Sequence, residues 1–193
     1  MPSVEQYAAL PRSRRLRRLA LTADQLQAAI ARPAAVEDSA ARPAVARPAA
    51  VEDSAVTTTA IADSAVLSRR PAPHAWAPVE IVCHLRDTEE WFLTRCRWAI
   101  AMDAPVFPRN NPDRWAEERQ YLRHDCRVAL QSFRRWREES LEFFASLSES
   151  AWARGGVHLD SRGRRTIDEF LSITAWHDDN HLDQLVRALD GRP

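Results

Sequence analysis

Two histidines near the end of the chain have the spacing of a metal-binding pair. His177 and His181 are four residues apart, so in an α-helix they project from one face with Cβ atoms about 5–6 Å apart. Neutral imidazole is a common ligand of zinc and also suits nickel, iron and copper. The pair therefore predicts half of a site for one divalent ion, with zinc or nickel expected first and iron or manganese as alternatives.

A third imidazole would complete the ligand set that is usual in catalytic sites with open positions. His84 is the candidate, because it lies beside Ile81 and Leu85 on the apolar stripe of another helix, and His158 is the substitute if His84 does not reach the pair. A single histidine in a helical core is more often a hydrogen-bonded core residue. Two imidazoles buried together would cost on the order of a few kcal/mol if unpaired, whereas a metal satisfies both.

The apolar pattern predicts four helices that hold these side chains, and hence an all-α fold, a four-helix bundle. Apolar residues recur every three or four positions from Leu16 to Ile30, from Pro78 to Ala101, from Leu122 to Leu147, and from Thr166 to just before Gly191. The last helix opens with a capping box of Thr166 and Glu169. Three prolines and two asparagines in residues 104–115 exclude a continuous helix there and predict a long crossover connection.

A repeat separates the first two helices. ARPAAVEDSA occurs at residues 31–40 and again at 46–55, and the segment is rich in Ala, Pro, Ser and acidic residues. Two such copies cannot bury enough apolar surface to form a solenoid. We therefore expect one domain over residues 1–193, a four-helix bundle in which residues 31–68 are a disordered, low-complexity insertion.

The bulk composition limits the partners. The chain has 193 residues with 27 basic and 27 acidic side chains, which gives no net field for nucleic acid or a membrane surface. It has neither a long apolar run nor a secretory signal, and its three cysteines form no CxxC pair, so we expect a cytoplasmic protein with reduced thiols. The arginines of the first helix are typical of a helix face that is exposed to solvent. The alternative is that this face mediates self-association of the chain as a homodimer.

Two segments together resemble the DinB-like superfamily, also called YfiT-like metal-dependent hydrolases. They are HAWAPVEIVCHLRDTEEWF at residues 74–92 and GRRTIDEFLSITAWHDDNHLDQL at residues 163–185. The resemblance covers residues 1–30 and 69–191 and rests on a combination of positions. These are Trp76, Glu80, His84, Leu85, Asp87, Glu89, Gly163, Thr166, His177, His181, Leu182 and Gln184. Ala77, where the family often has a hydroxyl residue, and the repeat insertion depart from the family pattern.

The resemblance implies a bundle with a long crossover in which His84, His177 and His181 hold one metal ion with water at the remaining positions. It also implies a small-molecule substrate, because members include thiol S-transferases and an isomerase that use low-molecular-weight thiols such as bacillithiol or mycothiol. We therefore expect a metalloenzyme, either a thiol-dependent S-transferase or a hydrolase. The alternative is a non-catalytic, metal-stabilised bundle acting in stress response or self-association.

No catalytic residue follows from the sequence, but Asp87 and Glu89 lie three and five residues after His84 and are candidates to orient a ligand imidazole. Exposed helix charges are the competing interpretation of both. Trp76 and Trp152 lie next to predicted helices and are candidates for the mouth of the pocket.

Overall fold

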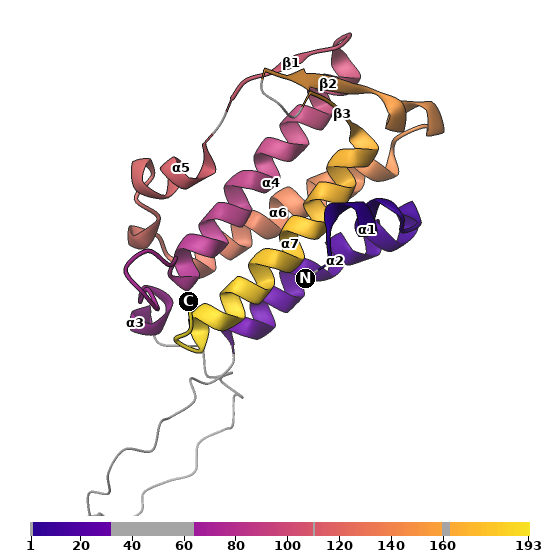
Figure 1. The fold of residues 1–193 in the computed structure, drawn as a ribbon. Coiled ribbons are helices and arrows are strands. Elements are labelled where there is room, and N and C mark those ends of the chain that lie inside the picture. Colours follow the sequence, from indigo (N-terminus) through magenta and orange to yellow (C-terminus); the bar gives the residue numbers. More distant parts are fainter. Residues whose placement is uncertain (1, 32–63, 110, 160–162) are drawn as a thin grey trace, which may run out of the picture.

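The computed structural model describes residues 2–31, 64–109, 111–159 and 163–193, and in these ranges it is dominated by four long helices (Figure 1). They are α2 (Arg12–Ile30), α4 (Pro78–Ala101), α6 (Cys126–Ala145) and α7 (Ile167–Leu189). The shorter elements are α1 (Val4–Ala8), α3 (Ser64–Leu67), α5 (Pro112–Glu118), the 3₁₀ turns η1 (Tyr121–Arg123) and η2 (Glu149–Ala153), and the strands β1 (Val106–Phe107), β2 (Gly155–His158) and β3 (Arg164–Thr166).

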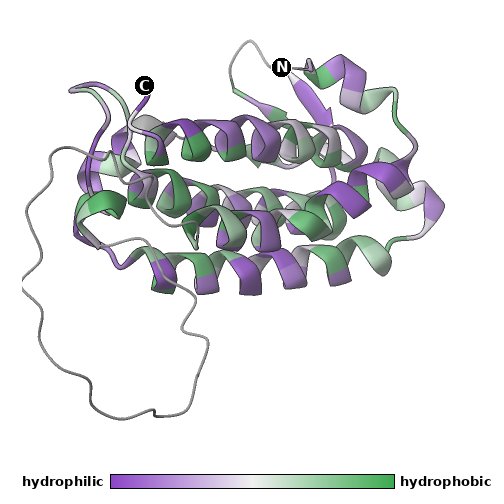
Figure 2. Ribbon diagram, turned by 90° about the horizontal axis from the view of Figure 1, so that it is seen from below, coloured by the Kyte–Doolittle hydropathy of each residue, from purple (hydrophilic) through white to green (hydrophobic). Residues whose placement is uncertain are grey.

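The long helices pack into a bundle around an apolar core, which confirms the predicted fold class. α2 and α7 run in the same direction, since Arg15 pairs with Asp168 and Thr22 with Asp178 further along both helices. α4 runs against α7, because His84 faces His177 whereas the later Phe92 packs on the earlier Phe170. Hydrophobic and hydrophilic residues alternate around each long helix (Figure 2), as amphipathic packing requires.

The helix ends follow the local chemistry of the sequence. Thr166 Oγ1 accepts a hydrogen bond from the Glu169 amide at 3.1 Å, and the Glu169 carboxylate accepts from the Thr166 amide at 2.7 Å, so the predicted capping box is present. Pro78 begins α4, and the Glu80 carboxylate accepts from the Ala77 amide at 2.9 Å. Both helices that carry the candidate histidines therefore begin at fixed points.

The connection between α4 and α6 is the predicted crossover, and it contains structure that the sequence did not suggest. It passes through β1, α5 and η1, and runs back along the bundle so that α6 starts near the beginning of α4 (Figure 1). β1 pairs in parallel with β2, and β2 pairs antiparallel with β3. This small sheet, which periodicity did not predict, covers the end of the bundle where α4 ends and α7 begins.

Other boundaries also differ from the prediction. The third helix begins at Cys126 after the Asp125 N-cap, and Leu122 is 39% exposed, so Leu122 is not part of its packed face. Most of the predicted insertion, residues 32–63, lies outside the described residues. The prediction of disorder was wrong for the last residues of this insertion, because residues 64–67 form α3 and Leu67 is buried in the core.

Candidate metal centre

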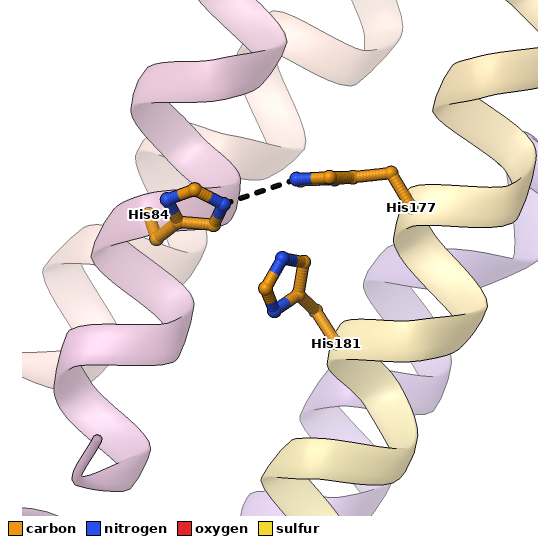
Figure 3. Close-up of side chains that lie close together, drawn as sticks. All are labelled: His84, His177 and His181. Carbon is orange, nitrogen blue, oxygen red and sulfur yellow. Dashed lines mark hydrogen bonds between the residues drawn. The ribbon is translucent and has the colours of Figure 1, made fainter. Parts of the chain in front are cut away.

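Three imidazoles meet between α4 and α7 (Figure 3). His84 comes from α4, whereas His177 and His181 come from successive turns of α7. His84 Nε2 lies 3.0 Å from His177 Nε2, and one nitrogen from each of the three rings lies within 4.8 Å of the others. His84 is buried, and His177 and His181 are half-buried. The four-residue spacing on α7 and the antiparallel course of α4 together produce this convergence.

Burial keeps two of these imidazoles neutral. Desolvation, followed by the effect of His181, lowers the pKa of His84 to about 3, against a smaller opposing effect of Asp87. Burial also lowers the pKa of His177 well below its ordinary value, and His181, His84 and Arg137 add to the shift. A neutral imidazole carries a lone pair, which is the form that binds a metal.

The separation of one pair of nitrogens fits a shared divalent ion. Two nitrogens held at about 2.1 Å from one ion with an angle of about 90–110° lie about 3.0–3.4 Å apart, and the Nε2 atoms of His84 and His177 lie 3.0 Å apart, at the lower end of this range. His181 Nδ1 contacts the Gln184 side-chain oxygen at 2.7 Å, so that Nδ1 carries the proton and Nε2 the lone pair. An orienting acceptor on the second ring nitrogen is typical of histidine ligands.

One polar atom of the cluster has no partner in the described part of the chain. His84 Nδ1 is buried and makes no hydrogen bond within the described residues. One turn later on the same helix, the buried Thr88 Oγ1 is also without a partner. Buried polar groups are seldom left unpaired in a native protein, so these two atoms mark a region where an additional hydrogen-bonding group is expected.

A cavity opens beside the histidines. It has a volume of about 610 Å³ and is lined by Arg70, Pro73, His74, Ala75, Trp76, His84, Pro112, Ala116, Glu117, His181 and Gln184. The Trp76 ring lies 4.8 Å from the His84 ring and 6.2 Å from the His181 ring, between centroids. Trp76 thus lies at the pocket as expected. Trp152 does not, because it is buried against Phe144.

His158 does not take part in the cluster. It lies on β2, buried beside Phe107 and Phe170, with ring centroids 5.2 and 6.1 Å away. It is therefore not needed as a substitute for His84.

The two acidic candidates are bound by other side chains. Asp87 accepts hydrogen bonds from Arg86 and from the Tyr121 hydroxyl, both at 2.6 Å, and also from Arg119. Asp87 therefore affects His84 through its charge and not through a hydrogen bond.

Glu89 accepts two hydrogen bonds from Arg137, at 2.9 and 2.7 Å. Arg137 is a residue that the sequence interpretation missed, although it falls on the packed stripe of α6 with Phe133, Ser140 and Phe144. The spacing of its apolar neighbours could have identified it, whereas its charge is typical of a residue on the solvent side. Gln184, three residues after His181, was noted only as part of the family pattern.

Comparisons with known proteins agree with this geometry. The model of the DinB superfamily matches residues 49–185. A protein from Halalkalibacterium halodurans, named as a candidate metal-dependent hydrolase, is 24% identical over 131 residues, which are 68% of this chain and 75% of that protein. None of the helices in the described part of the chain has the length and apolar character to span a membrane.

Two solved structures share the fold. YfiT from Bacillus subtilis, described as a candidate metal-dependent hydrolase with an unusual four-helix bundle topology, superposes with a TM-score of 0.70 at 15% identity, covering 92% of this chain and 85% of YfiT. A mycothiol-dependent maleylpyruvate isomerase superposes with a TM-score of 0.62 at 12% identity. The alignment covers 96% of this chain but 63% of the isomerase.

Proposed function

The chain belongs to the DinB superfamily, and from this premise we propose that it is a metalloenzyme that binds one divalent ion through His84, His177 and His181. The proposal extends to the reaction, which is hydrolysis of a small molecule or transfer of a low-molecular-weight thiol to it. The observation that carries it is the meeting of three imidazoles, two of which, His84 and His181, line a cavity of about 610 Å³.

The donor set suggests which ions the site takes. Three imidazole nitrogens suit zinc and nickel, and also iron, whereas magnesium and calcium prefer oxygen ligands. Among the described residues, the cluster contains no fourth His, Cys, Asp or Glu. Three protein ligands with an open position are typical of catalytic zinc sites. When bound, such an ion supplies a Lewis acid that lowers the pKa of a coordinated water or thiol.

The surrounding residues prepare the site for that ion and for a substrate. Gln184 holds His181 in one tautomer, and burial keeps His84 neutral. Trp76 forms an aromatic wall beside two of the histidines, and about 610 Å³ is within the range of small-molecule sites. The related proteins named as metal-dependent hydrolases support a hydrolytic reaction, and the mycothiol-dependent isomerase supports the thiol-dependent alternative.

Metal content is the first test of the proposal. The untagged protein is purified, reconstituted with zinc or nickel, and analysed by mass spectrometry. We expect about one equivalent of metal for the wild type, and a loss of metal for His177→Ala, which removes one arm of the α7 pair. His124→Ala, at an exposed position, is the matched control and should bind as the wild type does. Less than half an equivalent in the reconstituted wild type would refute the metal site.

Activity is the second test. The metal-loaded protein is assayed with ester and amide substrates, and with electrophilic substrates in the presence of mycothiol or bacillithiol. We expect turnover in one of these two sets, and its loss in the His177→Ala variant. If the metal-loaded wild type turns over neither set, the enzymatic part of the proposal is wrong although the metal site stands.

A further inference from the structure

A buried cluster of charges lies inside the bundle next to the histidines. Arg137 on α6 donates to both oxygens of Glu89, at 2.9 and 2.7 Å, and to both oxygens of Asp178, at 2.6 and 3.1 Å. The side chains of Arg137, Glu89 and Asp178 are 2%, 3% and 1% exposed, respectively. A guanidinium shared between two carboxylates at this depth is rare, because each ion loses its hydration.

The cluster joins all four long helices. Glu89 belongs to α4 and Asp178 to α7, and Arg137 also donates to the Leu19 carbonyl of α2 at 2.9 Å. The Thr22 hydroxyl of α2 donates to Asp178 at 2.6 Å. The guanidinium therefore fixes α4 and α7, the two helices that carry the histidines, with respect to each other.

The cluster is also close to the histidines along the chain. Asp178 directly follows His177, and Glu89 is five residues after His84, about 7.5 Å along the axis of α4. The guanidinium and its two carboxylates therefore lie within about two turns of two of the histidines.

Stability alone is a poor explanation of the cluster. Replacing a buried ion pair by apolar side chains of similar volume is often neutral or stabilising. Such groups are better explained by specificity, in this case by the relative placement of two helices that must bring nitrogens to one point.

We infer that Arg137, Glu89 and Asp178 form a positioning group for the three-histidine site, setting its affinity for a divalent ion through the placement of α4 and α7. The inference rests on the proposed metal site. The acidic neighbours of the histidines then serve the metal without touching the imidazoles.

The test compares two buried arginines. Arg137→Lys keeps a positive charge but cannot make paired hydrogen bonds to two carboxylates. Arg15→Lys is the matched control, because Arg15 is 4% exposed and joins α2 to α7 through Asp168 and Ser172. Asp168 lies nine residues before His177, about 13 Å along the helix axis. Zinc affinity is measured by competition with a chromophoric chelator, the absorption spectrum with Co²⁺, and the fold by thermal melting.

We expect Arg137→Lys to weaken zinc binding by about 10-fold to 100-fold, as is usual for residues that orient metal ligands, and to change the Co²⁺ spectrum. Arg15→Lys should lower the melting temperature but bind zinc within about twofold of the wild type. If Arg137→Lys is folded and binds zinc and Co²⁺ as the wild type does, the inference is wrong while the metal site stands. If the wild type binds no metal, both fail.

A second variant tests the positioning role of this cluster if Arg137→Lys does not fold. Glu89→Gln keeps the size and shape of the side chain, but its amide nitrogen cannot accept one of the two hydrogen bonds from Arg137. We expect zinc affinity to fall at least about threefold, whereas Glu139→Gln, at an exposed position of α6, should have no effect. Equal affinities of the two glutamine variants and the wild type would overturn the inference.

Discussion

Lowering the pH should destabilise the metal-free protein. The loss of stability should begin at a higher pH than the one at which the carboxylates titrate. His84 has an ordinary pKa of 6.5, and in the folded protein burial lowers this pKa to about 3. A lowered pKa means that the unfolded chain binds a proton which the folded chain does not. The stability is therefore complete above pH 6.5 and is lost as the pH falls toward 3.

The structure sets the magnitude of this loss. Each pH unit below 6.5 costs about 1.4 kcal/mol for one such histidine, so lowering the pH from 7 to 5 removes about 2 kcal/mol through His84. The side chain is only 5% exposed, so solvent screening does not reduce this value greatly. For a chain of this size, about 2 kcal/mol corresponds to a decrease of roughly 4–8 °C in the melting temperature. His177 contributes a loss of the same sign, because its pKa is also lowered.

Thermal melting of chelator-treated protein at pH 7, 6 and 5 measures this effect. His84→Gln removes the titrating group at a similar size, so its melting temperature should fall less steeply than that of the wild type. His124→Gln, at an exposed position, is the control and should follow the wild type. The lowered pKa values of Asp87 and Asp168 affect stability only below about pH 5 and do not interfere. Identical slopes for His84→Gln and the wild type would refute the claim that His84 is buried as a neutral imidazole.

Substitutions at three further positions test other parts of the structure. Gln184→Leu removes the acceptor of His181 Nδ1 and should weaken zinc binding by about 10-fold or more in a chelator competition, whereas Gln184→Glu should keep it. Thr166→Ala removes half of the capping box and should cost about 1 kcal/mol in denaturant unfolding, and an unchanged midpoint would contradict this. Gly156→Ala should destabilise the chain by about 1–3 kcal/mol, which thermal melting measures. The reason is that the new Cβ would lie 2.4 Å from the Phe107 ring and 2.5 Å from the Pro105 carbonyl oxygen.

The helices and the histidine pair could be predicted because both depend on one period. Apolar residues on α4 and α7 recur every three or four positions, and the same period brings His177 and His181 to one face. The relation of His84 to that pair depends on how α4 lies against α7, which periodicity within one helix does not specify. The family resemblance predicted that His84 joins the pair. The packing of Phe92 on Phe170 shows how α4 lies against α7 so that His84 reaches it.

The sheet and the buried arginine were missed for different physical reasons. β1, β2 and β3 are two to four residues long, too short for an alternating pattern, and β2 begins with two glycines that resemble a loop. Gly156 is required there because the Phe107 ring fills the space of a side chain. Arg137 has the right position for the core but the wrong residue type, and its partners on other helices, Glu89 and Asp178 above all, make its burial possible.

The placement of the histidines bears on whether a bound metal would serve chemistry or structure. A chain that needs a metal to fold usually has too small a core, as in zinc fingers. Here the core is extensive without the histidines, since Leu19, Ile81 and Leu185 are at most 1% exposed within apolar clusters. Removing the metal should then reduce the free energy of unfolding only by the binding free energy of the metal. The melting temperature should fall accordingly, and the helical content at room temperature should not change. A structural zinc site would also fill its fourth position with a protein ligand. Two of the three histidines, His84 and His181, instead line a cavity large enough for a small molecule, which supports catalysis over metal-dependent stability.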